Sequence, residues 1–296
     1  MGTHPKSPST VASTNQILSE YLKENPSLMG EKIVNQFNAQ DGNLPFLFKV
    51  LSIEKALSIQ AHPNKKKAAD LHAKRPEVYK GSFTCVSSGN LTYNLVEDAN
   101  HKPEMALALT PFRALCGWRP LPEVEAHIKA TPELESLISP LVRRRFALLP
   151  DASPTPSPFV GTGPAIAEAK QGLQDIFTCI MTKDEAEIKK QLEVLVQRYE
   201  KGEDVGSVSQ DLIDLVLRLN SQFPGDAGIF CVFLLNYVTL NPGEAIFLGA
   251  GEPHAYVEGG EPVLSITQVD RCIKLYSRHY RMHGQLGQCR SSGSHT

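Results

Sequence analysis

The chain has 296 residues, and its 41% of hydrophobic residues is enough to bury one large core or two smaller ones. The formal net charge of −2 argues against binding to nucleic acid or to a membrane surface, so we expect neither partner. The sequence contains no apolar run of membrane-spanning length and no signal-like start, which predicts a cytoplasmic protein. The six cysteines are scattered without a CxxC pair, as is typical of reduced structural thiols.

The first third of the chain is predicted to be mostly β structure after one short helix. Apolar residues at helical spacing predict a surface helix that begins near Asn15 and ends at Pro26. Residues 43–53 (NLPFLFKVLSI) are almost continuously apolar, which indicates a buried strand. Lys49 interrupts this run, and its ammonium group must reach either solvent, the more common outcome, or an anionic ligand.

The next stretch, residues 57–64 (LSIQAHPN), alternates apolar and polar residues as a strand does. Side chains two residues apart on a strand lie on the same face, so Gln60 and His62 should lie together. A pair of this kind is more often an ordinary surface pair than a binding site. Two later stretches, residues 101–104 (HKPE) and 252–256 (EPHAY), each contain a Glu and a His from which further ligands can be drawn. A Gln, a Glu and two His form a mixed ligand set that zinc accepts, so the three stretches predict a metal site.

The segment between the first two of these stretches is less regular. Residues 64–75 (NKKKAADLHAKR) are basic with helical content, and such a run is usually a solvated face, although Lys65 beside a metal site could attract a phosphate. Residues 80–97 are small, hydroxylated and largely uncharged, which indicates a loop insertion.

Strand-like alternation returns over residues 105–118, and the chain then becomes helical. Residues 120–145 have helical periodicity, and His127 on the apolar face is interpreted as a core or surface histidine rather than a ligand. Residues 150–164 are rich in Pro and Ser and are interpreted as a linker. Three amphipathic helices are predicted next, over residues 165–182, 184–201 and 208–220.

Two apolar strands are predicted to follow, over residues 228–237 and 239–248, the second with a Pro-Gly turn. A His-bearing turn then closes the pattern, as in cupin jelly rolls that carry metal ligands at the barrel mouth. The predicted fold class is therefore β-rich with an inserted helical subdomain, the β part being a cupin-like jelly roll.

We divide the chain into four parts on this basis. Residues 1–119 form a cupin-like β part with the insertion at 80–97, and residues 120–223 form the helical subdomain with the linker at 150–164. Residues 224–260 return to the β part, and residues 261–296 have no strand or helix period and are predicted to be a divergent, disordered tail.

Several long motifs, in this order along the chain, resemble one known family. They are MGTHP, NLPFLFKVLS, LSIQAHPNK, DANHKPEMALALTPF, LCGWRP, FPGD, LNPGEAIFL and PHAY. On these motifs, which extend from Met1 to about Gly260, the chain resembles the type I mannose-6-phosphate isomerases, which are zinc enzymes.

The resemblance implies a metal centre, a reaction and a set of substrate contacts. It implies one zinc ion per chain, held by the residues that match the family's ligands: Gln60, His62, Glu104 and His254. It implies interconversion of mannose 6-phosphate and fructose 6-phosphate through an enediol, with the small sugar phosphate as partner, and it implies that the β part is a truncated, cupin-like jelly-roll catalytic domain. We also expect the chain to be a monomer. Lys102 is the candidate catalytic residue, and the candidate substrate-binding residues are Lys49, Ser58, Lys65 and Tyr256.

The chain also departs from the family pattern at both ends. The family has a Trp-bearing strand before MGTHP, and after the position of Gly260 it has a segment with a catalytic Arg and a further β domain, which this sequence is expected to lack. Two functions from different classes therefore stay open: a zinc-dependent isomerase, or a non-catalytic, cupin-like zinc-binding truncated isoform.

Overall fold

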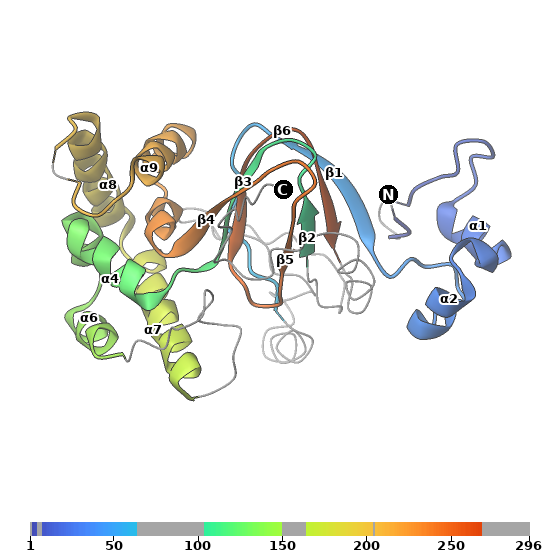
Figure 1. Ribbon diagram of the computed structural model, residues 1–296, viewed down its shortest axis with the longest axis horizontal. Helices are drawn as coiled ribbons and strands as arrows, with labels where there is room; N and C mark the ends of the chain where they lie inside the picture. The colour runs from blue at the N-terminus through green and yellow to red at the C-terminus, as the bar shows by residue number, and fades with distance from the viewer. Residues whose placement is uncertain (1, 5–7, 64–103, 150–163, 204, 268–296) are drawn as a thin grey trace, which may run out of the picture.

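A computed structural model describes residues 2–4, 8–63, 104–149, 164–203 and 205–267 (Figure 1). An antiparallel sheet lies in the middle, with the helices of residues 121–222 on one side and the N-terminal helices on the other. The predictions for Lys65, Lys102, the insertion at 80–97 and most of the linker fall outside the described residues. Within them, no helix is long and apolar enough to cross a membrane.

The sheet contains six strands in the described part of the chain. Their bounds are Leu47–Ile53 (β1), Glu104–Leu107 (β2), Phe112–Trp118 (β3), Leu235–Leu240 (β4), Ala245–Leu248 (β5) and His254–Thr267 (β6). The strand order is β4-β3-β6-β2-β5, and β1 also pairs with β6. The expected strand over 105–118 is thus two strands, β2 and β3, joined by a short turn.

The long strand β6 holds the sheet together by changing partners along its length. Its first half pairs with β3, where Cys116 is opposite His254, while its last residue, Thr267, lies between Glu104 of β2 and Leu47 of β1. Figure 1 shows the strands arching over one another as a result. The antiparallel sheet with its attached helices confirms the predicted fold class. β6 continues to Thr267, so the prediction that regular structure ends at Gly260 is wrong for the backbone of residues 261–267.

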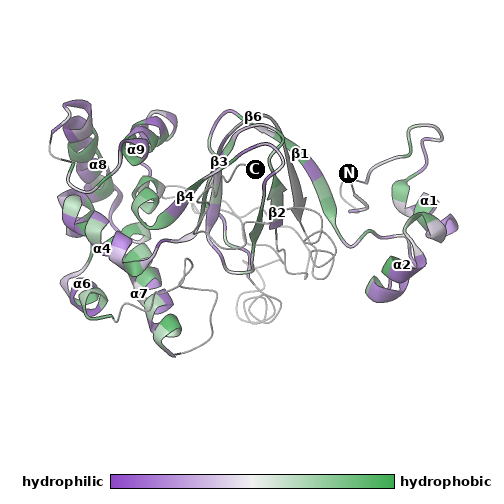
Figure 2. Ribbon diagram, viewed as in Figure 1, coloured by the Kyte–Doolittle hydropathy of each residue, from purple (hydrophilic) through white to green (hydrophobic). Residues whose placement is uncertain are grey.

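The helices between Leu121 and Gln222 lie on one side of the sheet, and we call them the helical subdomain. Their bounds are Leu121–Ala130 (α4), Pro132–Leu137 (α5), Pro140–Ala147 (α6), Pro164–Met181 (α7), Glu185–Glu200 (α8) and Gln210–Gln222 (α9). The side chain of Asp184 caps α8 by accepting hydrogen bonds from the amides of Ala186 and Glu187. Figure 2 shows both polar and apolar residues on these helices, as expected for helices that bury one face.

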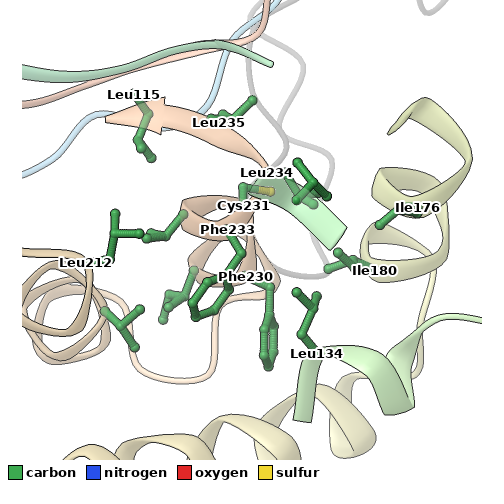
Figure 3. Close-up of a cluster of buried hydrophobic side chains, with 14 of the residues drawn as sticks. Leu115, Leu134, Ile176, Ile180, Leu212, Phe230, Cys231, Phe233, Leu234 and Leu235 are labelled. Atoms are coloured by element: carbon green, nitrogen blue, oxygen red, sulfur yellow. The ribbon is translucent and has the colours of Figure 1, made fainter. Parts of the chain in front are cut away.

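The prediction of a strand over residues 228–237 is wrong in its first half. Residues Ala227–Phe233 form a 3-10 helix (η2), and only Leu235–Leu240 form a strand. The Asp226 carboxylate accepts a hydrogen bond from the Gly228 amide and starts the helical turn. Figure 3 shows Phe230 and Phe233 of η2 inside the core, among side chains from α5, α7 and α9. A segment buried on all sides has no polar face, so its sequence has no period that would distinguish helix from strand.

Two further strand predictions need correction. β1 is a strand, but it is not buried: Lys49 and Val50 are exposed, and the Lys49 ammonium reaches solvent. Residues 57–63 are extended but not a regular strand, because only Gln60 forms an isolated bridge, to His254.

The N-terminal helices lie on the far side of the sheet from the helical subdomain (Figure 1). They are Leu18–Glu24 (α1), Pro26–Leu28 (η1) and Glu31–Phe37 (α2). The predicted surface helix before Pro26 corresponds to α1 and is confirmed.

Candidate metal centre

Three buried side chains meet at one end of the sheet. His62 follows the extended segment, Glu104 is the first residue of β2, and His254 is the first residue of β6. Their exposed fractions are 5%, 8% and 4%, and one ligand atom from each lies within 4.8 Å of the others. Residues separated by almost 200 positions therefore form one compact cluster of a carboxylate and two imidazoles.

Backbone hydrogen bonds position the two histidines. The amides of Gln60 and His254 each donate to the other's carbonyl oxygen, both at 2.8 Å. The carbonyl oxygen of His62 accepts a hydrogen bond of 2.6 Å from the Gly251 amide, which attaches the segment to the turn before β6. Gln60 and His254 therefore lie opposite each other on two paired segments. The hydrogen bond from Gly251 holds His62 next to the turn before β6.

The distances within the cluster suit ligands around a shared ion. Oε1 of Glu104 lies 3.3 Å from Nε2 of His62, and Oε2 of Glu104 lies 3.4 Å from Nε2 of His254. In a tetrahedral zinc site with bonds of about 2.0–2.1 Å, neighbouring ligand atoms are roughly 3.3–3.4 Å apart. The two separations are long for charge-assisted hydrogen bonds, and they place each imidazole nitrogen at about this ligand-to-ligand distance from one oxygen of the carboxylate. The three residues therefore fit a zinc ion.

The protonation states also suit a metal ligand set. The Nδ1 atom of His254 lies 2.9 Å from the carbonyl oxygen of Glu252, so it carries the proton and leaves the Nε2 lone pair directed at the cluster. The buried Nε2 atoms of His62 and His254 have no hydrogen-bond partner among the described residues. Burial opposes ionisation of Glu104, whereas positive charge on the imidazoles of His254 and His62 holds the pKa of that carboxyl well below its ordinary value. A zinc ion would supply that positive charge where the imidazoles are neutral ligands.

Tyr256 orients the Glu104 carboxylate. Its hydroxyl donates a hydrogen bond of 3.0 Å to Oε2 of Glu104, and both residues are buried. Its ring packs edge-on against Phe112, with 5.3 Å between the ring centroids. We predicted Tyr256 as a substrate-binding residue and missed this hydrogen bond. The spacing of two residues from His254 on one strand was a signal for it, since both side chains must share a face.

The other predicted site residues are less closely grouped. Gln60 is backbone-paired with His254, half-buried, and adjacent to the cluster. Ser58 lines a small apolar pocket between the extended segment and the helical subdomain, and Lys49 is exposed on β1. His127, which we excluded as a ligand, is buried outside the site with Nδ1 3.1 Å from the carbonyl oxygen of Phe233.

Two family models match this chain. Residues 1–84 and 89–121 match the catalytic domain of type I phosphomannose isomerase, and residues 159–235 match its helical insertion domain. The second match covers α7 to α9 and η2, which form most of the helical subdomain.

Curated relatives show the same likeness over most of the chain. The chain is 45% identical over 265 residues to a mannose-6-phosphate isomerase of Cryptococcus neoformans, covering 88% of this chain and 57% of that protein. It is 40% identical over 263 residues to the mannose-6-phosphate isomerase of Homo sapiens, covering 88% and 55%. The chain therefore spans slightly more than half the length of the curated relatives it matches.

Solved structures resemble the fold as well. A crystal structure of a mannose 6-phosphate isomerase bound with zinc and yttrium matches with a TM-score of 0.66 and 29% identity, over 90% of this chain and 58% of that one. The apo form of the enzyme from Salmonella typhimurium matches with a TM-score of 0.64 and 30% identity, over 90% and 57%.

Proposed function

Because the chain belongs to the type I phosphomannose isomerase family, we propose that it is a zinc-dependent isomerase that interconverts mannose 6-phosphate and fructose 6-phosphate. The observation that carries the proposal is the buried cluster of His62, Glu104 and His254, in which both Nε2 atoms lack a hydrogen-bond partner among the described residues. Leaving buried polar atoms unpaired is costly, so a cluster of them indicates a ligand.

Zinc is proposed to bind at the three clustered residues with Gln60 as the fourth ligand. When bound, it would polarise the sugar carbonyl and stabilise negative charge at that oxygen. Glu104 remains ionised in this position, and the Tyr256 hydroxyl orients its Oε2 atom. The Glu252 carbonyl oxygen keeps the His254 ring in the tautomer that presents Nε2.

The reaction itself moves a proton between adjacent carbons of the open-chain sugar. A base removes the proton from C2 of the aldose and returns one to C1. The C2 hydroxyl loses its proton to become the ketone, and the C1 oxygen gains one to become a hydroxyl. Lys102 is proposed as the catalytic residue, because it lies two positions before the ligand Glu104. Lys49, Ser58, Lys65 and Tyr256 are proposed as substrate contacts, and the cations among them suit the phosphate group. We also propose that the chain acts in the cytoplasm as a monomer.

A coupled assay of fructose 6-phosphate formation tests the proposal. Purified chain with zinc should turn over mannose 6-phosphate, and a chelator should abolish turnover. Glu104→Gln should lose activity because it removes the anionic ligand, whereas the matched control Glu203→Gln, at an exposed carboxylate of the helical subdomain, should keep it. Zinc binding without turnover would contradict the isomerase proposal and leave the non-catalytic, zinc-binding alternative.

A further inference from the structure

The segment that carries Gln60 and His62 has few hydrogen bonds to the sheet. The Leu57 amide donates to the carbonyl oxygen of Tyr256 at 2.8 Å, and the next pairing is the bridge between Gln60 and His254. The segment therefore advances three residues, from Leu57 to Gln60, while β6 advances two, from Tyr256 to His254. This mismatch prevents a continuous ladder of backbone hydrogen bonds. The sheet alone leaves residues 54–59 without the regular pairing that fixes side chains on a strand.

The end of α9 also supplies hydrogen bonds to this segment. Oε1 of Gln222 accepts a hydrogen bond of 3.0 Å from the Ala56 amide. Nη2 of Arg218 donates to the carbonyl oxygen of Glu54 at 3.3 Å, and its Nη1 pairs with Glu258 of β6. Two side chains of one helix turn thus connect the helical subdomain to the backbone just before the metal ligands.

Other contacts between the end of α9 and the segment are a cation–π contact and apolar packing, which depend less on direction than a hydrogen bond does. The ammonium of Lys55 lies 4.3 Å from the ring centroid of Phe223, and Ala56 and Ile59 line an apolar pocket together with Leu219. Apolar contacts stabilise the segment but tolerate sliding, whereas a hydrogen bond to a backbone amide fixes its register.

We propose that Gln222 is a positioning residue for the metal centre: its hydrogen bond to Ala56 sets the register of the segment that presents Gln60 and His62. The inference rests on the proposed zinc site and extends it, because it makes a side chain of the helical subdomain responsible for the geometry of ligands in the β part. Gln222 touches neither metal nor substrate and acts only through the segment.

Amide hydrogen exchange of the metal-free protein tests the positioning directly. Gln222→Leu removes the acceptor at similar size, and the amides of Leu57 and Gln60 should then exchange at least tenfold faster while amides of β3 are unchanged. Gln222→Glu keeps an acceptor oxygen and should restore slow exchange. Ser221→Ala is the matched control, since Ser221 is exposed on the same turn and its hydroxyl donates to the Arg218 carbonyl oxygen rather than to the segment.

Zinc affinity, measured by chelator competition, is the second readout. Gln222→Leu should raise the zinc dissociation constant about tenfold, as changes behind metal ligands do, and Gln222→Glu and Ser221→Ala should leave it near the wild-type value. If Gln222→Leu does not fold, Gln222→Asn replaces it, because its shorter amide no longer reaches Ala56.

Unchanged exchange at Leu57 and Gln60, or unchanged zinc affinity in a folded variant, would overturn the inference. A wild-type chain that takes up no zinc would instead contradict the proposed function, while the exchange rates would still decide whether Gln222 holds the segment. The two failures are therefore distinguishable.

Discussion

Tyr256→Phe isolates the hydrogen bond between the tyrosine hydroxyl and the Glu104 carboxylate. The substitution keeps the ring that packs against Phe112 and removes one oxygen atom. A hydrogen bond to a charged group contributes about 1.5–3 kcal/mol, and the loss of a contact behind a metal ligand lowers affinity roughly 10- to 100-fold. The two ranges agree, because a tenfold change in binding corresponds to about 1.4 kcal/mol.

We therefore expect the zinc dissociation constant of Tyr256→Phe to rise roughly 10- to 100-fold at neutral pH. The assay is competition with a chelator of known affinity, together with thermal unfolding of the metal-free form to confirm that the variant is folded. Phe112→Leu is the control for the packing contribution, because it alters the ring contact and retains the hydroxyl. If Tyr256→Phe binds zinc within about twofold of the wild type, the hydroxyl does not orient Glu104 and the reasoning is wrong.

Two other predictions concern buried charge in the helical subdomain. Arg198→Met leaves Glu133, which is 5% exposed and bonded to Arg198 at 2.8 and 3.0 Å, without its cation, so urea unfolding should show a loss of about 3–5 kcal/mol. A loss under about 1 kcal/mol would show that the pair contributes little. Burial lowers the pKa of His127, so the unfolded chain takes up a proton that the folded chain resists, and the free energy of unfolding should fall as pH drops below about 6.5. His127→Asn should flatten this dependence while keeping a donor to Phe233, and an equal slope in both proteins would refute the assignment.

The sequence allowed much of the helical subdomain to be predicted. Helices α7, α8 and α9 each have one apolar face and polar residues elsewhere, so their periodicity is readable. Periodicity failed for η2, because its residues are buried on all sides. It also failed for the burial of β1, since an apolar run does not say whether a neighbouring layer will cover it.

The candidate site was predicted from residue chemistry and from the family resemblance rather than from spacing alone. Same-face spacing suggested Gln60 with His62, but nothing local to either residue places it near Glu104 or His254. Those contacts depend on β6 pairing with both β3 and β2, a property of the whole sheet. Gln222 was not predictable, because its partner is a backbone amide 166 positions away.

Calorimetric titration of the metal-free chain with zinc tests the central claim most directly. We expect one zinc ion to bind per chain, with binding lost or strongly weakened in His62→Ala, since that change removes one of the three clustered ligands. Absence of binding by the wild-type chain, or equally tight binding by His62→Ala, would contradict a metal centre at this cluster.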